Sequence, residues 1–345
     1  MTSLSTDFTD KLFAEYEANA KYSAIENAVT HNGLLKSIET RQSEVENDHV
    51  FSIDLTKDEV SNQKASGRCW MFAALNTFRH KLISDFKLES FELSQAHTFF
   101  WDKYEKSNWF LEQIIATADQ EIGSRKVKFL LDTPQQDGGQ WDMVVSLFEK
   151  YVGLKLSDYV SVINAPTADK PYGKSYTVEM LGNVVGAPSV RYINLPMDRF
   201  KELAIAQMKA GETVWFGSDV GQVSDRQKGI LATNVYDFTA SMDINLTQDK
   251  AGRLDYSESL MTHAMVLTGV DLDADGRPVK WKVENSWGDK VGQKGYFVAS
   301  DAWMDEYTYQ IVVRKDFLTA EELAAYEAEP QVLAPWDPMG ALASK

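Results

Sequence analysis

Residues 62–70, NQKASGRCW, contain the only cysteine of this 345-residue chain and stand directly before a run of apolar residues with helical spacing. The apolar residues recur after gaps of 4, 3, 4 and 4 positions: Met71, Leu75, Phe78, Leu82 and Phe86. This spacing is typical of one face of a helix with 3.6 residues per turn. We therefore expect a helix that begins near Cys69, with the thiol at its first turn.

Cys69 has the surroundings of a reactive thiol in this position. The first N–H groups of a helix lack backbone partners and, together with the positive end of the helix dipole, stabilise a thiolate. Gly67 leaves room for a sharp turn into the helix, Ser66 offers a hydroxyl to free amides, and Gln63 can donate its side-chain amide in front of the thiol. A lone cysteine is otherwise most often a small buried apolar residue, so the assignment depends on partners elsewhere.

The base that a nucleophilic thiol needs can come from one of five histidines. Four of them lie in the polar first third of the chain, with no adjacent pattern that sets them apart: His31, His49, His80 and His97. His263 instead opens HAMVLTGVD (263–271), an apolar run rich in strand formers that is followed by the turn-like DADG at 273–276. A histidine at a strand end is more often an ordinary surface or core residue. The assignment of His263 as the base therefore depends on a second residue that can hold its ring.

A second strand-like run, WKVENSWG (281–288), supplies that partner. Alternation along this run places four side chains on one face: Trp281, Val283, Asn285 and Trp287. An asparagine beside a tryptophan is costly to bury unless its amide is hydrogen-bonded. Adjacent antiparallel strands would bring Asn285 to His263, so that its carbonyl holds one ring nitrogen while the other takes the thiol proton. Taken singly, a strand asparagine more often marks a bulge or a turn.

Three motifs occur in an order that resembles one enzyme family: Gln-x5-Cys-Trp, His-Ala-Met-Val-Leu and Glu-Asn-Ser-Trp-Gly. They resemble the cysteine peptidases of the papain superfamily, in particular the branch of bleomycin hydrolase and bacterial aminopeptidase C. Further similarity runs through FFWDKYEK (99–106) and APWDPMGALA (334–343), so the resemblance covers nearly the whole chain. It implies an α+β, papain-like fold of two lobes, a helical lobe with the nucleophile and an antiparallel β lobe with the histidine and asparagine.

The resemblance also implies a role for each site residue. The catalytic residues would be Cys69 as nucleophile, His263 as base and later acid, Asn285 as its orienting partner, and Gln63 as an oxyanion donor beside the Cys69 backbone N–H. Four positions would shape the substrate site: Gly138, Gly139, Trp287 and Ala343. The glycines resemble a pair whose backbone aligns an extended substrate, and the tryptophan resembles one that shields the histidine–asparagine hydrogen bond from water. A thiolate–imidazolium pair would let iodoacetamide alkylate the thiol well below neutral pH.

The C-terminal tail, residues 330–345, resembles a segment that lies in the active-site cleft of this branch. There its terminal carboxylate anchors the free amino group of the substrate and restricts cleavage to the N-terminal residue. Three prolines disfavour helix and predict an extended tail: Pro330, Pro335 and Pro338. Residues 340–343 are mostly small enough to thread a groove, and Ser344 and Lys345 would be trimmed or overhang. The alternative is an ordinary frayed terminus.

One departure from the family pattern lies near residues 151–156. Members of the branch continue there into a long, mostly helical excursion, whereas this chain joins Tyr151 to Ser157 through only VGLKL. The excursion forms part of the surface by which subunits pack into a homo-hexameric ring, so the oligomeric state is left open.

We expect four parts along the chain: a helical arm at 1–50, a helical lobe at 51–158, a β-rich lobe at 159–329 and the cleft-bound tail at 330–345. The aromatic residues between 99 and 110 should lie in the core.

The amino-acid composition indicates which classes of molecule the chain can bind. The chain has 35 basic and 51 acidic residues, a net charge of -16 that disfavours nucleic acid and favours the protonated amino terminus of a peptide. A single cysteine cannot form an internal disulfide, and charges interrupt the long apolar stretches, so we expect a cytoplasmic protein that does not enter membranes. We expect neither cofactor nor metal, because the acidic turn at 271–276 lacks the closing glutamate of a calcium loop.

The function that this reasoning favours is a cysteine aminopeptidase acting on peptides with a free N-terminus. Two alternatives stay open. One is a shortened, non-catalytic homologue that acts only as a scaffold. The other is an endopeptidase or amide hydrolase that uses the same thiol.

Overall fold

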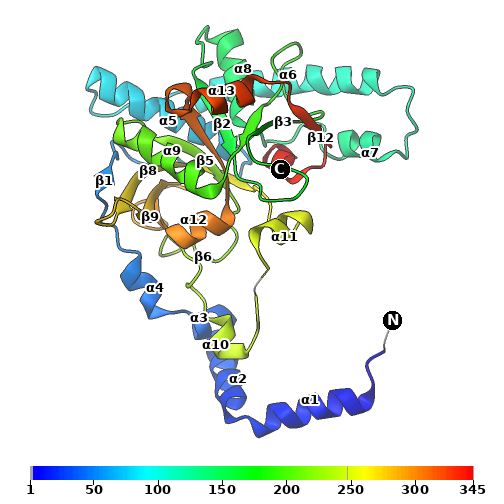
Figure 1. Ribbon diagram of the computed structural model, residues 1–345, viewed down its shortest axis with the longest axis vertical. Helices are drawn as coiled ribbons and strands as arrows, with labels where there is room; N and C mark the ends of the chain where they lie inside the picture. The colour runs from blue at the N-terminus through cyan, green and yellow to red at the C-terminus, as the bar shows by residue number, and fades with distance from the viewer. Residues whose placement is uncertain (1–2, 247, 345) are drawn as a thin grey trace.

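The structure, a computed structural model, describes residues 3–246 and 248–344 (Figure 1). The chain begins with four helices: α1 (Thr6–Ala18), α2 (Ala20–Asn32), α3 (Leu34–Ile38) and α4 (Arg41–Glu46). Helices α1 and α2 have no buried residues and extend away from the body of the molecule (Figure 1). Lys21 and Tyr22 of α2 contact Asp243, at the end of α10 (Phe238–Met242), so the arm is held by a loop from the second half of the chain.

Four further helices follow between the arm and the main run of strands: α5 (Cys69–Phe86), α6 (Gln95–Ala116), α7 (Arg125–Asp132) and α8 (Trp141–Tyr151). The helix predicted to begin near Cys69 is thus confirmed, and its first position is Cys69 itself. Residues 69–77 of α5 are all buried, because the helix lies between the sheet and α6 and α8. Helix α5 is therefore the central helix of the molecule and holds the thiol deep inside it.

Twelve strands form one mixed sheet in the order β12-β3-β4-β2-β11-β5-β8-β9-β10-β7-β6, with β1 paired to β8. The strands are β1 (Ile53–Asp54), β2 (Tyr159–Ile163), β3 (Lys174–Val178), β4 (Tyr192–Asn194), β5 (Val214–Ser218), β6 (Ser224–Asp225), β7 (Ile230–Leu231), β8 (His263–Leu272), β9 (Pro278–Glu284), β10 (Tyr296–Ser300), β11 (Thr308–Arg314) and β12 (Gln331–Leu333). The remaining helices are α9 (Met197–Lys209), α11 (Lys250–Asp255), α12 (Asp301–Tyr307) and α13 (Ala320–Glu327), with 3-10 turns η1 (Lys315–Phe317) and η2 (Pro338–Ser344). The α+β class predicted from the sequence is therefore confirmed.

The central strands are buried on both faces, and alternation assigns their side chains to two cores. One core contains Cys69 and packs against α5 and α8; strands β5 and β8 contribute Trp215, Ala264 and Val266 to it. The other core lies under α9 and α12 and receives Phe216, Met265 and Leu267 from the same strands. The thiol helix is thus packed directly on the strand that begins with His263.

Strands β8 and β9 form the antiparallel hairpin that the sequence predicts, with Val266 opposite Glu284. The acidic turn between them is closed by Asp273, whose carboxylate accepts hydrogen bonds from the backbone and side chain of Arg277. Asn285 follows the last residue of β9 and so lies near the start of β8. The register of this hairpin brings the two predicted catalytic residues to the same end of the sheet.

Two expectations about local structure are wrong. The tail is extended only in β12, because Pro338 begins a 3-10 turn through Ser344 instead of continuing a strand. On α6, Phe99 and Trp101 pack against the core as expected, but Phe100 is 60% exposed, whereas Asp102, Glu105 and Lys106 are buried. These charged residues are buried because they pair with one another and with neighbouring elements, which sequence periodicity alone does not reveal. The predicted domain boundaries stay a prediction.

Candidate active site

Cys69 occupies the first position of α5 and is 4% exposed. Its thiol lies close to the backbone N–H groups of Trp70 and Ala264, which favour the thiolate. Ala264 is the residue directly after His263, so the sulfur lies beside the start of β8. The structure therefore brings the predicted nucleophile and the predicted base to one place, from elements nearly 200 residues apart in sequence.

His263 is hydrogen-bonded to Asn285 as the sequence predicts, with 2.9 Å between His263 Nε2 and Asn285 Oδ1. The same oxygen accepts the backbone N–H of Ser286 at 2.8 Å, which identifies it as the carbonyl oxygen of the amide. An oxygen can only accept here, so the neutral imidazole carries its proton on Nε2. Nδ1 is then left with a lone pair and can act as a base.

Trp287 packs against the imidazole, with 5.0 Å between the ring centroids of Trp287 and His263 and an interplanar angle of 35°. The guanidinium of Arg226 lies 5.0 Å from the centroid of the same tryptophan ring. The tryptophan is half-buried, and it covers His263 from the side of β10, where it also contacts Phe297. This position fits the predicted shield over the histidine–asparagine pair, a role that stays a prediction.

Gln63 is buried and held at both ends of its side-chain amide. Its Nε2 donates to the carbonyl of Ser66, and its Oε1 accepts the hydroxyl of Ser286. Its backbone N–H also donates to the Ser286 carbonyl at 2.8 Å, which ties this segment to the residue after Asn285. An amide nitrogen has two hydrogens, and the second can face an oxyanion in front of Cys69. The geometry permits the predicted oxyanion role without testing it.

Gly138 and Gly139 lie in a tight contact where no side chain fits. A Cβ on Gly139 would come within 2.5 Å of the Trp70 ring, and one on Gly138 within 2.2 Å of the Leu342 carbonyl oxygen. The indole N–H of Trp70 donates to the carbonyl of Asp137 at 2.7 Å, which joins this loop to the start of α5. The glycine pair therefore brings its backbone next to the cysteine helix on one side and to the tail on the other.

The C-terminal tail packs into the core that contains Cys69. Met339, Leu342 and Ala343 are 1%, 0% and 3% exposed, and all three belong to this core. Tyr192 and Gln140 each donate to the Met339 carbonyl at 3.3 Å. The frayed terminus considered as an alternative is wrong for residues 338–344, which form an ordered turn that lies near β3 in Figure 1. Lys345 lies outside the described residues.

Sequence reasoning missed a buried lysine that supports the glycine loop. Lys106 Nζ donates to the carbonyl of Gly138 at 2.6 Å and pairs with Asp102 at 2.8 Å. Asn183 in turn donates to the same aspartate at 3.0 Å. The signal in the sequence was the spacing of four between Asp102 and Lys106, which allows an ion pair on one helix face.

Burial works against charge on both predicted catalytic groups, Cys69 and His263. Burial raises the pKa of Cys69 to about 11, although three backbone N–H groups lower it. Burial also lowers the pKa of His263 to about 4, with a smaller opposing effect from the hydrogen bond to Asn285. Burial therefore favours the uncharged form of each group and opposes the expected thiolate below neutral pH, which stays a prediction.

Alkylation of Cys69 by iodoacetamide should accordingly be slow at pH 7 in the folded chain and should accelerate toward pH 11. The sign follows from the raised pKa of Cys69, since a thiol stays protonated until the pH approaches its pKa. Mass spectrometry between pH 5 and 11 measures this rate on the only cysteine. The urea-unfolded chain is the control and should titrate near the ordinary thiol pKa of about 8.5. Fast labelling with a plateau below neutral pH would instead show that the ion pair forms.

Neither a metal centre nor a spanning helix is found in the part of the chain that the structure describes. Within residues 3–246 and 248–344, no group of three or more His, Cys, Asp or Glu side chains is placed to hold a metal ion. No helix in these ranges combines the length and apolarity needed to cross a membrane.

The comparisons with known proteins agree with the site geometry. The sequence model of the Peptidase C1-like family matches residues 3–152 and 146–340. Aminopeptidase C of Streptococcus thermophilus is 75% identical over 445 aligned positions that cover 100% of each chain. Aminopeptidase C of Lactococcus lactis subsp. lactis is 56% identical, with 99% of this chain and 100% of the relative covered.

A solved structure and the lengths of these alignments add two further findings. The crystal structure of PepW from Lactobacillus rhamnosis has a TM-score of 0.95 and 46% identity, and the match covers 99% of this chain and 100% of that one. The first alignment spans 445 positions against 345 residues here, so about 100 positions have no counterpart in this chain. The two segments of the family match meet at 146–152, where the sequence predicts the missing excursion. These matches show that the chain belongs to the Peptidase C1-like family.

Proposed function

We propose that this chain is a cysteine aminopeptidase, which removes N-terminal residues from peptides by acyl transfer through Cys69. The observation that carries the proposal is the buried tail, packed against Gly138 in the same core as the thiol. The relatives named aminopeptidase C, one of them 75% identical over its full length, support the same activity. In this proposal the packed tail leaves space for only the first residue of a substrate beside the thiol and excludes further chain there.

In the first half-reaction the sulfur of Cys69 attacks the carbonyl carbon of the first peptide bond. His263 Nδ1 accepts the thiol proton during the attack, because burial keeps the pKa of His263 near 4 and its ring uncharged at neutral pH. The developing oxyanion is held by the Gln63 amide and the free backbone N–H of Cys69 at the helix start. The imidazolium then gives its proton to the leaving amine, the C–N bond breaks, and an acyl thioester remains.

In the second half-reaction water releases the first residue. His263 Nδ1 takes a proton from a water molecule, the resulting hydroxide adds to the thioester carbonyl, and the C–S bond breaks. The proton returns from the imidazolium to the departing sulfur. Asn285 keeps the His263 ring in one orientation and one tautomer through both half-reactions. Its side-chain oxygen accepts the hydrogen bond from His263 Nε2, at 2.9 Å in the structure.

The tail supplies the preference for a free amino terminus in this proposal. A carboxylate at the end of the tail pairs with the protonated amine of the substrate, with Ala343 beside the glycine loop. Trimming of Ser344 and Lys345 would move that carboxylate to Ala343. The net charge of -16 adds a general attraction for cationic amino termini. Peptides are thus the proposed partners, and neither nucleic acid nor membranes are proposed. A cytoplasmic location is proposed because a single cysteine cannot form an internal disulfide.

Paired substrates test this function. Aminoacyl-arylamides with a free amino group should be hydrolysed on the order of 100-fold faster than their N-acetylated forms, because the blocked nitrogen is uncharged and leaves the carboxylate unpaired. The ratio of kcat/KM for each pair, measured on the full chain, gives the result. Equal rates would favour the endopeptidase or amide hydrolase alternative. Whether this chain forms the homo-hexamer of the family stays open, because the missing excursion forms part of the contact between subunits.

A further inference from the structure

Three polar side chains meet in the interior between the cysteine helix and the strand that leads to Asn285. Arg79 and His80 lie on α5, and Glu284 is the last residue of β9. Arg79 Nη2 lies 2.5 Å from one carboxylate oxygen of Glu284, and His80 Nε2 lies 2.5 Å from the other. The three side chains are 4%, 4% and 0% exposed. Each oxygen of the glutamate thus has its own partner on α5, in a place that water does not reach.

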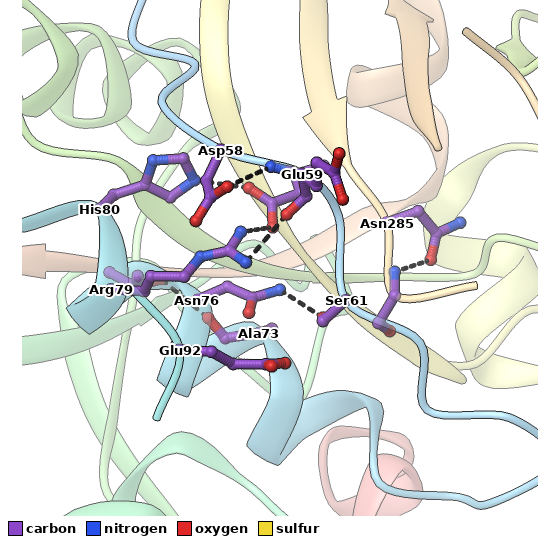
Figure 2. A network of polar contacts seen from close by, with 12 residues as sticks. Asp58, Glu59, Ser61, Ala73, Asn76, Arg79, His80, Glu92 and Asn285 are labelled. Atoms are coloured by element: carbon purple, nitrogen blue, oxygen red, sulfur yellow. Dashed lines mark hydrogen bonds and ion pairs between the residues drawn. The ribbon is translucent and has the colours of Figure 1, made fainter. Parts of the chain in front are cut away.

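The same face of α5 also holds the segment that leads to Gln63. Arg79 Nη1 donates to the Glu59 carbonyl at 2.9 Å, and Asn76 Nδ2 donates to the Ser61 hydroxyl at 2.9 Å. In Figure 2, Arg79 and Asn76 point from α5 toward the segment with Glu59 and Ser61, and Asn285 lies on the other side of that segment. The helix therefore contacts both the oxyanion segment and the end of β9.

The far side of this segment is joined to the residues around Asn285. The Gly288 N–H donates to the Ser61 carbonyl at 3.1 Å, and the Gln63 N–H donates to the Ser286 carbonyl at 2.8 Å. Asn62 forms an isolated antiparallel bridge with Trp287. Residues 59–63 are thus fixed between α5 and the turn after β9.

We propose that Glu284 is a positioning residue, which sets the end of β9, and with it Asn285 and His263, at a fixed place relative to Cys69. This inference rests on the proposed function, in which these three residues must meet. Ten residues of α5, about 15 Å of rigid helix, connect Cys69 to Arg79. A carboxylate held by a donor on each oxygen cannot slide along that helix without losing one of them. The next residue in the chain is Asn285, so a shift at Glu284 moves the hydrogen bond to His263.

The burial of Glu284 with its two partners distinguishes a positioning role from a contribution to stability. A buried ion pair contributes little net stability compared with apolar residues of similar volume, whereas its geometry is specific. A displacement of about 1 Å in a catalytic group costs on the order of 100-fold in rate. The proposal therefore predicts a loss of turnover larger than any loss of substrate binding.

The test is Glu284→Gln, which keeps the size of the side chain and removes one acceptor for the two α5 donors. We expect kcat for an aminoacyl-arylamide to fall at least 10-fold while KM stays within about two-fold. The His263 Nε2–H resonance in proton–nitrogen NMR should shift, and its exchange with water should accelerate at least 10-fold. Assignment of this resonance uses His263→Gln.

The matched control is Glu322→Gln, which removes one carboxylate from a pair with Arg199 on the far side of the sheet. We expect this variant to keep kcat, KM and the His263 resonance within about two-fold of the unaltered chain, whatever its effect on Tm. A folded Glu284→Gln chain that behaves in the same way would overturn the proposal. If Glu284→Gln does not fold, His80→Leu removes the α5 donor to one Glu284 oxygen. It should give the same fall in kcat and the same change of the His263 resonance, and a folded His80→Leu chain with unchanged kcat and resonance would overturn the proposal.

The NMR measurement also separates the two proposals from each other. An unaltered chain that fails to hydrolyse arylamides would contradict the proposed function. The His263 resonance would still report whether Glu284 holds the His263–Asn285 pair in place. Loss of that resonance in Glu284→Gln alone would support positioning, and its retention would refute it.

Discussion

Cys69→Ala should lower kcat for aminoacyl-arylamides by on the order of 10⁴-fold or more, the largest effect expected of any single substitution in this chain. The sulfur forms the covalent bond to the substrate, and alanine offers no atom that can replace it. At about 1.36 kcal/mol per tenfold change in rate, this corresponds to about 5 kcal/mol of lost transition-state stabilisation. Loss of one buried atom at a helix start should leave the fold intact, so circular dichroism should be unchanged.

Two controls make the Cys69→Ala result specific. His97→Ala alters an exposed histidine whose Nε2 accepts the indole N–H of Trp101, and it should keep kcat within about two-fold. Stoichiometric alkylation of the unaltered chain, which has one cysteine, should abolish activity in proportion to labelling. Equal turnover by the unaltered and Cys69→Ala chains would mean that the hydrolysis does not come from this thiol. Only the scaffold alternative would then be left for this site.

The placement of Cys69, His263 and Asn285 was predictable from sequence, because local patterns indicate where a helix or strand begins and ends. The apolar spacing after Cys69 predicted a helix, and it begins at that residue. Alternation and a turn predicted the β8–β9 hairpin, whose register then brings Asn285 to His263. Each of these inferences used residues within about 20 positions of one another, where periodicity is informative.

Long-range burial was not predictable in the same way. His80 stood in a polar segment with no distinguishing pattern, yet its side chain is 4% exposed because Glu284, 204 residues later, is its partner. The helix dipole at Cys69 favoured a thiolate, but the sulfur lies in a core that the tail completes, and burial raises its pKa to about 11. Both features have one cause, since the burial of a polar or ionisable group depends on contacts that a local window does not contain.

Deletion of Leu342–Lys345 should convert the preference for a free amino terminus into tolerance of a blocked one. In the full chain the Leu342 carbonyl oxygen lies 2.2 Å from where a Cβ on Gly138 would be, and Leu342 and Ala343 belong to the same core as Cys69. Without this segment, a substrate can extend across the glycine loop. An N-acetylated substrate is then no longer penalised for leaving the carboxylate of the tail without a positively charged partner. We expect kcat/KM for N-acetylated arylamides to rise at least about 30-fold relative to the free-amine substrates. Water admitted to the cleft should also lower the pKa of Cys69, which faster alkylation at pH 8 would reveal.

Two matched variants separate loss of the carboxylate from loss of packing in this experiment. Leu342→Ala keeps the terminus but removes a fully buried side chain, at a cost of about 2–5 kcal/mol in the free energy of unfolding. Deletion of Ser344 and Lys345 alone moves the carboxylate to Ala343 and leaves the packed residues in place. Both should still discriminate against blocked substrates, because a carboxylate remains at the end of a tail that fills the cleft. If the Leu342–Lys345 deletion retains the same preference, the amino terminus is recognised elsewhere, and the cleft-bound tail only contributes to packing.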